Sequence, residues 1–365
     1  MSGEGAGFDR LIEQTQAKHL LGSALREGPA HAYLLHGPAG VGKRVAALAF
    51  AGQMLGDPDR VERRAHPDLY VLEPHGDQIR IDDVRELRRD LHMRPFEGEH
   101  RVYLIFDAHL LNPEAADSLL KDLEEPPEYA VVVLAADELG PIPETIRSRC
   151  QLVPFRRLSE RAVRAEAEQL APGLAPDELT AVARVAAGRL DRVSRLLDRA
   201  PARRRGELLR IARSVYADPA FDPAAAAQAV IALAAERAAE AKAAAEEGLE
   251  LRALPEREAD QYVRRAERGA EREEIILALE ELAAWYRDLV VVAAGAERAI
   301  VHYDHLAELA EDGTAERMLG SERAAEAVRE LWRTFEEFNV TPALALEAMF
   351  VRARRAFAAA PLATV

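Results

Sequence analysis

The stretch HAYLLHGPAGVGKR, residues 31–44, decides the fold of this chain. It opens with a short apolar run that predicts a buried strand, and it continues into a glycine-rich loop that ends in lysine. Glycine lets backbone N–H groups curl around phosphate oxygens, lysine adds a point charge, and the N-terminus of a following helix adds partial positive charge. We therefore interpret Gly37, Gly40, Gly42 and Lys43 as a phosphate-binding loop. The alternative is a glycine-rich turn kept only for its shape.

The residue after the lysine departs from the usual pattern of phosphate-binding loops. Ser or Thr normally stands there, because its hydroxyl ligates the Mg²⁺ that accompanies a nucleotide. This chain carries Arg44, whose cationic guanidinium cannot ligate a metal ion. The loop therefore predicts the fold but not an active ATPase site.

The run RVYLIFD, residues 101–107, predicts a second buried strand that delivers Asp107 to the carboxyl edge of the same sheet. An aspartate at this place can hold a Mg²⁺-bound water. In hydrolytic proteins with such a loop, a glutamate follows the aspartate and orients the attacking water, whereas Ala108 follows it here. Together with Arg44, this departure predicts little or no hydrolysis. The alternative is an aspartate that only caps a loop at the end of its strand.

Short apolar runs alternate with helical patterns over the first part of the chain. Each run has the length of a strand that is buried on both faces, and the gaps are long enough for crossover helices, which is typical of a parallel α/β sheet. We therefore predict an α/β P-loop core with a parallel five-stranded sheet over residues 1–157. The expected strands are residues 33–36, 69–72, 102–106, 131–134 and 151–155.

The remaining residues predict helices only. Short helical segments broken by Pro and Gly predict a small helical bundle over residues 158–202, and we predict an all-α C-terminal domain over residues 203–365. Fourteen of the 22 residues 224–245 are alanine, the residue that most favours helix. Residues 275–292 form an amphipathic helical pattern, whereas residues 248–269 are charged and are expected to form a mobile connection.

Composition excludes several classes of function. The chain has 48 Lys and Arg against 63 Asp and Glu, a net charge of −15, whereas proteins that bind DNA through its phosphates usually carry a basic block. If the chain works beside DNA, we expect its partners to carry the positive charge. Cys150 is the single cysteine and the ten histidines lack metal-ligand spacing, so we expect neither a disulfide nor a zinc site. Without an apolar stretch of membrane-spanning length or a secretory pattern, we expect a cytoplasmic protein.

Two charged features lie between the second motif and the end of the expected sheet. Glu124 and Glu125 end a helical pattern just before two prolines, and we interpret them as solvated helix-end carboxylates rather than a metal site. The segment PETIRSRC, residues 143–150, predicts a helix just before the last strand. Arg149 in this segment could reach the γ-phosphate of a neighbouring subunit, because guanidinium is always charged and binds phosphate through two N–H groups. The alternative, which spacing alone favours, is a surface salt bridge.

Five strings occur in the order found in bacterial clamp-loader subunits: HAYLLHGPAGVGK, HPDLYVL, RVYLIFDAHLLNPEAADSLLKDLEEPP, IPETIRSRCQ and NVTPALALEAMFVR. The chain resembles the delta-prime family of DNA polymerase III clamp-loader subunits over nearly its whole length. This resemblance implies an AAA+ core, a lid and a C-terminal collar that holds the subunit in a pentameric loader. The LEEPP and SRC strings are distinctive of these subunits, whereas the phosphate-binding loop alone is not.

The resemblance also implies roles for single residues. Arg149 occupies the place of the SRC arginine, the finger that is offered in trans to ATP on the adjacent motor subunit. Lys43 and Asp107 match the loop lysine and the metal aspartate, and Arg44 and Ala108 depart from the motor pattern as delta-prime subunits commonly do. The implied function is a stator that helps to load the sliding clamp onto primed DNA. Its implied partners are gamma/tau-type motor subunits and a delta-type subunit, and it has no polymerase chemistry of its own.

Further departures limit what the resemblance carries over. Ala136 and Asp137 stand where motor subunits have the hydroxyl of the first sensor, and Asp191 stands near the place of the second-sensor arginine. Many family members bind zinc through a cysteine module between the loop helix and the HPDL strand, but residues 52–64 contain no cysteine, so we expect no zinc. Whether ATP binds stays open. The alternatives to a delta-prime stator are an active gamma/tau-type ATPase and a non-catalytic AAA+ adaptor.

Overall fold

The structure is a computed structural model of the 365-residue chain, and it describes residues 8–74, 78–249, 256–337 and 341–358. The chain divides into two compact units. Unit 1 consists of Met1–Glu166 and Gly188–Asp191, and unit 2 consists of Ala167–Ala187 and Arg192–Val365. The division into three domains after residues 157 and 202 stays a prediction.

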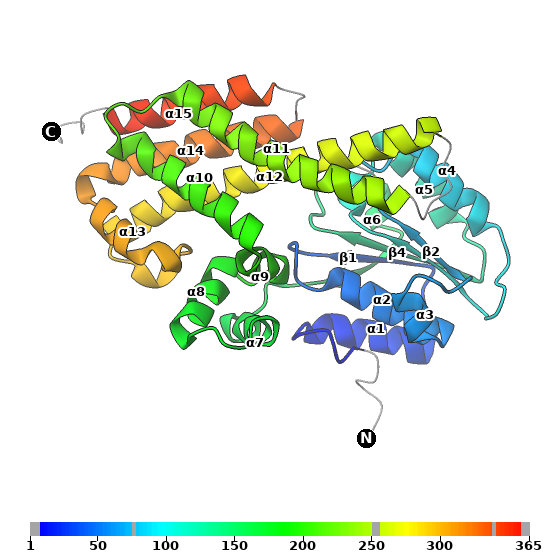
Figure 1. Ribbon diagram of the computed structural model, residues 1–365. Helices are drawn as coiled ribbons and strands as arrows, with labels where there is room; N and C mark the ends of the chain where they lie inside the picture. The colour runs from blue at the N-terminus through cyan, green and yellow to red at the C-terminus, as the bar shows by residue number, and fades with distance from the viewer. Residues whose placement is uncertain (1–7, 75–77, 250–255, 338–340, 359–365) are drawn as a thin grey trace. The chain divides into compact units, whose positions relative to one another are not determined.

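Unit 1 is built on a parallel sheet with the strand order β2-β3-β4-β1-β5 (Figure 1). The strands are β1 Ala32–His36, β2 Leu69–Leu72, β3 Arg101–Ile105, β4 Ala130–Ala136 and β5 Gln151–Pro154. In the parallel register, Tyr33 of β1 lies beside Val133 of β4 on one side and Gln151 of β5 on the other. Each apolar run that predicted a strand forms one, so the α/β fold class with a five-stranded parallel sheet is confirmed.

Helices cover both faces of this sheet because its strands are apolar on both sides. Leu34 and Leu35, neighbours in β1, point to opposite faces and belong to different clusters of buried side chains. The helices on the side of Leu35 are α1 Thr15–Glu27, α2 Lys43–Leu55 and α3 Pro58–Glu62. The helices on the side of Leu34 are α4 Ile81–Leu91, α5 Pro113–Glu124 and α6 Glu144–Arg147.

After the sheet, the described residues form helices and no strand, as predicted for the lid and the C-terminal region. These helices are α7 Glu160–Leu170, α8 Pro176–Ala186, α9 Leu190–Leu197, α10 Arg199–Ala217, α11 Pro223–Leu249, α12 Glu256–Ala293, α13 Leu306–Asp312, α14 Ala315–Glu337 and α15 Pro342–Ala358, with short 3-10 turns at Glu297–Ala299 and Tyr303–His305. In unit 2, Trp285 and Tyr286 of α12 are fully buried together with Val328 of α14 and Phe350 of α15. The core of unit 2 is therefore built between its long helices.

The expected mobile connection over residues 248–269 is wrong for its larger part. α11 ends at Leu249 and α12 begins at Glu256, while residues 250–255 lie outside the described residues. The charged sequence forms helix because Glu, Arg and Ala all have high helix propensity, and Val263 and Ala270 supply a buried side. The many charges therefore mark the solvated face of a helix and not a loop.

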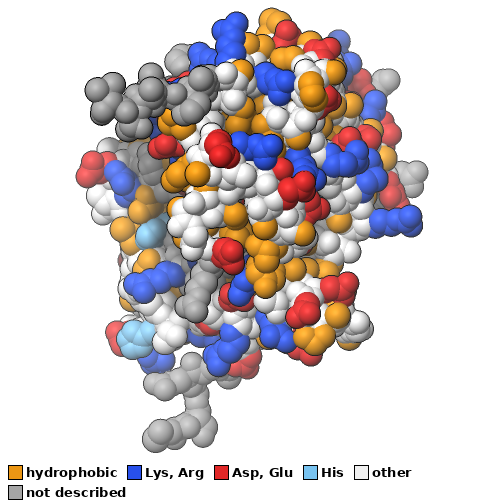
Figure 2. Space-filling model, turned by 90° about the vertical axis from the view of Figure 1, so that its left-hand side faces the viewer, with side chains coloured by type: hydrophobic (Ala, Val, Ile, Leu, Met, Phe, Trp, Pro, Cys, Tyr) orange, Lys and Arg blue, Asp and Glu red, His pale blue; other side chains and the backbone are white. Residues whose placement is uncertain are grey.

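Charge is distributed without large blocks of one sign on the visible surface. On the face shown in Figure 2, basic and acidic side chains are interspersed rather than gathered by sign. Among the described residues, no helix combines the length and the apolar character that crossing a membrane requires. This face therefore offers no basic block that would offset the acidic composition of the chain.

His302 lies in the core of unit 2 with none of its surface exposed. Its Nδ1 lies 2.9 Å from Oδ2 of Asp288, and its Nε2 lies 3.1 Å from Oε2 of Glu281. Asp288 also accepts the backbone N–H groups of Val301 and His302, and Glu281 accepts the Nε–H of Arg205. Burial acts to lower the pKa of His302, but the hydrogen bonds to the two carboxylates outweigh burial, so the pKa is raised. A positively charged His302 therefore joins α12 to the segment that follows it.

Replacing His302 should destabilise the protein more at acidic than at alkaline pH. Because the pKa is raised in the folded state, the stabilisation is complete below the unfolded pKa of about 6.5 and is lost as pH rises through the folded pKa. His302→Gln should lower the free energy of unfolding by roughly 3 kcal/mol at pH 6, because Asp288 and Glu281 each lose one buried cationic partner. The loss should be clearly smaller at pH 9, as measured by urea unfolding.

The partly exposed His305 provides the control for this measurement, since 29% of its side chain is exposed. His305→Gln should lower the free energy of unfolding at pH 6 by less than His302→Gln does, because the His305 side chain is only partly buried. An equal loss of stability at both pH values in His302→Gln would contradict a charged His302.

Candidate functional site

The phosphate-binding loop lies between β1 and α2, at the carboxyl edge of the sheet. Parallel strands end at the same edge, which is where ligands bind in folds of this kind. Asp107 follows β3 and Asp137 follows β4, so both reach the edge at which the loop begins. Of the site residues predicted from the sequence, the structure therefore gathers here Gly37, Gly40, Gly42, Lys43, Arg44 and Asp107.

Two glycines of the loop are required by close packing. Gly37 and Gly40 have φ values of 141° and 67°, which side chains other than glycine rarely adopt. A Cβ on Gly37 would lie 2.2 Å from the carbonyl O of Phe155, and a Cβ on Gly40 would lie 1.6 Å from Oδ1 of Asp191. The carbonyl O of Gly40 also accepts the N–H of Leu190 at 2.8 Å. The carboxylate of Asp191 therefore packs directly against the loop.

The Lys43 amine is bound by oxygen atoms of its own chain. The side chain is 6% exposed, and Nζ donates to the carbonyl O atoms of Gly37 at 2.6 Å and Pro38 at 2.5 Å. Oδ1 of Asp137 lies 2.7 Å from the same nitrogen. Burial lowers the pKa of Lys43, and the charge of Asp137 acts against this lowering. An ammonium group has three N–H donors, and these oxygens satisfy all of them.

Arg44 pairs with two carboxylates at the same edge. Its Nη1 lies 2.5 Å from Oε1 of Glu73, and its Nη2 lies 2.5 Å from Oδ2 of Asp107. Arg64 also pairs with Glu73, and the guanidinium of Arg44 lies 4.7 Å from the centre of the Phe106 ring. Burial acts to raise the pKa of Glu73, but the two arginines outweigh it and lower that pKa. Asp107, predicted from the sequence as a metal aspartate, thus binds a guanidinium of its own chain.

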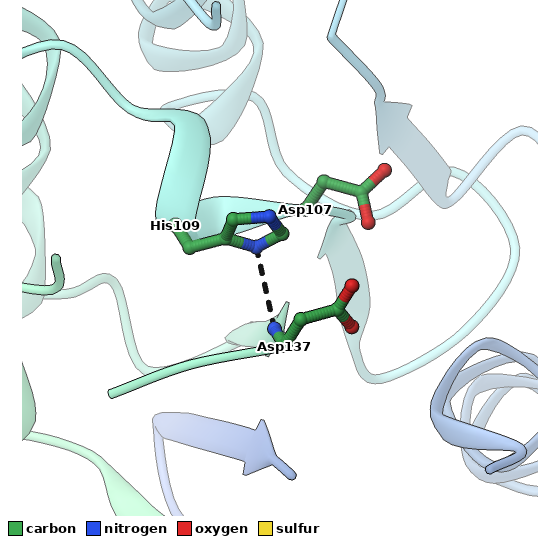
Figure 3. A group of neighbouring side chains, drawn as sticks. All are labelled: Asp107, His109 and Asp137. Atoms are coloured by element: carbon green, nitrogen blue, oxygen red, sulfur yellow. Dashed lines mark hydrogen bonds between the residues drawn. The ribbon is translucent and has the colours of Figure 1, made fainter. Parts of the chain in front are cut away.

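Asp107, His109 and Asp137 form a group of possible metal ligands at this edge (Figure 3). One ligand atom from each lies within 4.8 Å of the others, and Nδ1 of His109 accepts the backbone N–H of Asp137 at 3.3 Å. A neutral imidazole that accepts through Nδ1 carries its proton on Nε2, and a protonated nitrogen cannot ligate a metal. Arg44 and Lys43 also neutralise the two carboxylates. These residues therefore do not fit the Mg²⁺ ion that accompanies a nucleotide.

Glu73 and His109 also lie at this edge, although neither was predicted from the sequence. A signal for Glu73 was present, because it follows directly on the apolar run of β2 and so ends at the same sheet edge. His109 carries no such signal, because its place depends on the turn after β3. There Asp107 adopts a φ of 51° and a short 3-10 helix, Ala108–Leu110, begins.

Arg149 forms a second candidate site at the surface of unit 1, apart from the loop residues. α6 ends at Arg147, and Arg149 follows just before β5 with 35% of its side chain exposed. Its Nη1 donates to the carbonyl O of Thr145 at 2.8 Å, and its Nη2 donates to Oε1 of Glu124 at 2.6 Å. The salt bridge considered as an alternative from the sequence is therefore present, and its carboxylate comes from the LEEPP string.

A family model and several curated relatives each match part of the chain. The family model described as DNA polymerase III, delta subunit, matches residues 12–159. The delta' subunit of Pseudomonas aeruginosa is 39% identical over 136 residues, which cover 33% of this chain and 42% of that protein. The delta' subunit of Bacillus subtilis is 33% identical over 158 residues, 40% of this chain and 48% of that protein. The tau subunit of Bacillus subtilis is 31% identical over 170 residues, 43% of this chain and 30% of that protein. The chain spans less than half the length of each of these relatives.

Lys43→Ala should destabilise the protein, because the amine acts here as a structural group. Its loss removes the cation beside Asp137 and leaves two carbonyl oxygens without their donor. We expect the free energy of unfolding to fall by about 1–3 kcal/mol, the range for polar groups left unsatisfied. Urea unfolding measures the effect. Lys121→Ala, at an exposed position of α5, is the control and should stay within about 0.5 kcal/mol of the parent. Equal stability of the two variants would show that the loop does not depend on its lysine.

Proposed function

We propose that this chain, which over residues 12–159 matches the family model of the DNA polymerase III delta subunit, is a clamp-loader subunit of the delta-prime type. Such a subunit acts as a stator that helps to place the sliding clamp on primed DNA, and it supplies an arginine finger in trans to a neighbouring ATPase subunit. Its partners are gamma/tau-type motor subunits and a delta-type subunit. It acts on the clamp and on DNA through the assembled loader.

The ion pair between Arg44 and Asp107 carries this proposal. In an ATPase site of this fold, a hydroxyl after the loop lysine and an aspartate at the end of a strand hold Mg²⁺. Here a cation replaces the hydroxyl and binds the aspartate, and Asp137 binds the loop lysine. This arrangement supports a role without hydrolysis. Tau subunits are also among the relatives, so the motor type is the second candidate, but it needs the hydroxyl and the glutamate that Arg44 and Ala108 do not provide.

The position of Arg149 supports the proposal that this chain supplies an arginine finger to a neighbouring subunit. Its guanidinium lies at the surface of unit 1 and can face a neighbouring subunit. Guanidinium is always charged and can form two parallel hydrogen bonds with a phosphate. An arginine placed against a transferring phosphoryl group stabilises the negative charge that grows in the transition state. This stabilisation raises the rate of phosphoryl transfer by roughly 10³- to 10⁵-fold. The chain would thus give a catalytic group to a nucleotide that another subunit holds.

Charge and cysteine chemistry support an indirect role at DNA. The net charge is −15, so we propose that other loader subunits neutralise the DNA phosphates. Burial raises the pKa of the Cys150 thiol to about 12, which makes it a poor metal ligand at neutral pH. We therefore propose a cytoplasmic subunit that needs no zinc and does not hydrolyse any ATP that it binds.

The isolated chain should show no ATPase turnover above background. The carboxylate of Asp107 forms an ion pair with Arg44, and Ala108 stands where a carboxylate would orient the attacking water. A phosphate-release assay with Mg²⁺ and ATP tests this, with Lys43→Ala as the control for contaminating activity. Steady turnover that disappears in Lys43→Ala would favour the motor type instead.

Arg149→Ala should lower the ATPase and clamp-loading rates of a loader reconstituted with motor and delta-type subunits. Loss of the finger costs roughly 10³–10⁵ at the site that receives it. The other ATP sites of the loader keep their own fingers, so the rate of the whole complex should fall several-fold. Arg149→Lys should rescue poorly, because an ammonium group cannot form two parallel hydrogen bonds with phosphate.

Arg147 provides the matched control for this experiment. It lies two residues earlier, at the end of α6, and its Nη2 lies 3.9 Å from Oε2 of Glu144. Arg147→Ala should be milder than Arg149→Ala. If the loader with Arg149→Ala loads clamps at the wild-type rate, or if Arg147→Ala lowers the rate more, Arg149 is not the arginine finger. If this protein does not raise the DNA-dependent ATPase rate of the motor subunits at all, the result would favour the alternative of a non-catalytic AAA+ adaptor.

A further inference from the structure

Arg149 and Glu124 meet beside the C-terminal ends of α5 and α6. Nη2 of Arg149 donates to Oε1 of Glu124 at 2.6 Å, and 35% and 45% of the two side chains are exposed. Nη1 of Arg149 donates to the carbonyl O of Thr145, four residues earlier in the chain. Nη1 also lies 3.4 Å from Oγ of Ser148, so the guanidinium is held by one carboxylate, one backbone oxygen and, more weakly, one hydroxyl.

The place of Glu124 in α5 makes its carboxylate depend on a nearby cation. Glu124 is the last residue of α5, and Glu125, the next residue, adds a second negative charge. The C-terminus of a helix carries partial negative charge, so a carboxylate there is unfavourable unless a positive group lies close. Arg149 supplies that positive group across the gap between the two helix ends.

We propose that Glu124 is the resting partner of Arg149, and that the terminal phosphate of a nucleoside triphosphate on the neighbouring subunit must displace it before the finger can act. This inference rests on the proposed function of Arg149. Glu124 is then a positioning residue, because it acts through Arg149 and does not itself touch the phosphate. Its charge sets how readily the guanidinium becomes available.

The geometry suits an exchange of partners. Only the bond from Nη2 has to break, because the carbonyl O of Thr145 continues to hold Nη1 and keeps the side chain in place. Ion pairs between exposed groups shift an equilibrium by only about 1.4- to 5-fold. A phosphate binds guanidinium through two parallel hydrogen bonds and can therefore replace a single carboxylate oxygen.

The first test uses the full chain alone. Glu124→Gln removes the charge and keeps the shape of the side chain, and Glu125→Gln is the matched control at the adjacent exposed residue. Phenylglyoxal reacts with accessible guanidinium groups, and peptide mass spectrometry follows its reaction at Arg149. The rate should rise by about 1.4- to 5-fold in Glu124→Gln and stay at the parent value in Glu125→Gln. Equal rates of phenylglyoxal reaction at Arg149 in Glu124→Gln and in the parent would overturn the proposal that Glu124 is the resting partner of Arg149.

The second test uses the reconstituted loader. Glu124→Gln should raise kcat/KM for ATP by up to the same factor, because the phosphate no longer competes with a carboxylate. The increase should vanish in the Arg149→Ala background, a non-additivity that a merely structural role of Glu124 would not produce. A decrease in Glu124→Gln, or an increase that persists without Arg149, would overturn the inference and leave the finger intact. Absence of any effect of Arg149→Ala would instead refute the proposed function on which the inference rests.

Discussion

The buried amine of Lys43 must be surrounded by oxygen atoms, and this requirement shapes the functional edge of the sheet. Two of the oxygens are carbonyls of the loop itself, from Gly37 and Pro38, so the loop closes around its own lysine. The third belongs to Asp137, which ties the loop to the end of β4. With every donor satisfied inside the chain, the Lys43 amine joins the loop after β1 to the end of the neighbouring strand β4.

The same constraint explains why an acidic chain can bury several cations. A buried charge is costly unless it is paired and hydrogen-bonded. His302 in unit 2 lies between Asp288 and Glu281, and Arg101 at the start of β3 is 4% exposed and binds both carboxylate oxygens of Asp90. The surplus of Asp and Glu therefore does more than keep the surface solvated, because part of it provides the partners that these buried cations require.

The sheet could be predicted from the sequence because a run of apolar residues bounded by helical patterns has few other arrangements. The loop could be predicted because its glycines and its lysine stand at fixed spacing after such a run. The partner of each cation could not be predicted, since Glu73 and Asp137 follow strands that are distant in the sequence. They meet Arg44 and Lys43 only through the strand order, which places β3 and β4 between β2 and β1. The mobile connection predicted from the charges of residues 256–269 was wrong, because the exposed face of a long helix can have the composition of a loop.

Arg44 and Arg149 are both arginines that bind carboxylates, yet the two sites differ in how many contacts must break together. Arg44 binds Asp107 and Glu73, lies over the ring of Phe106, and shares Glu73 with Arg64. To free Arg44, the chain would have to break both ion pairs at once and leave two carboxylates beside the already occupied lysine. Arg149 has a single carboxylate partner. Although 48% of its side chain is exposed, Arg44 holds together the ends of β2 and β3 through its ion pairs with Glu73 and Asp107. Arg44 therefore gives the sheet edge a fixed arrangement, whereas Arg149, with a single carboxylate partner, has fewer ion pairs to break.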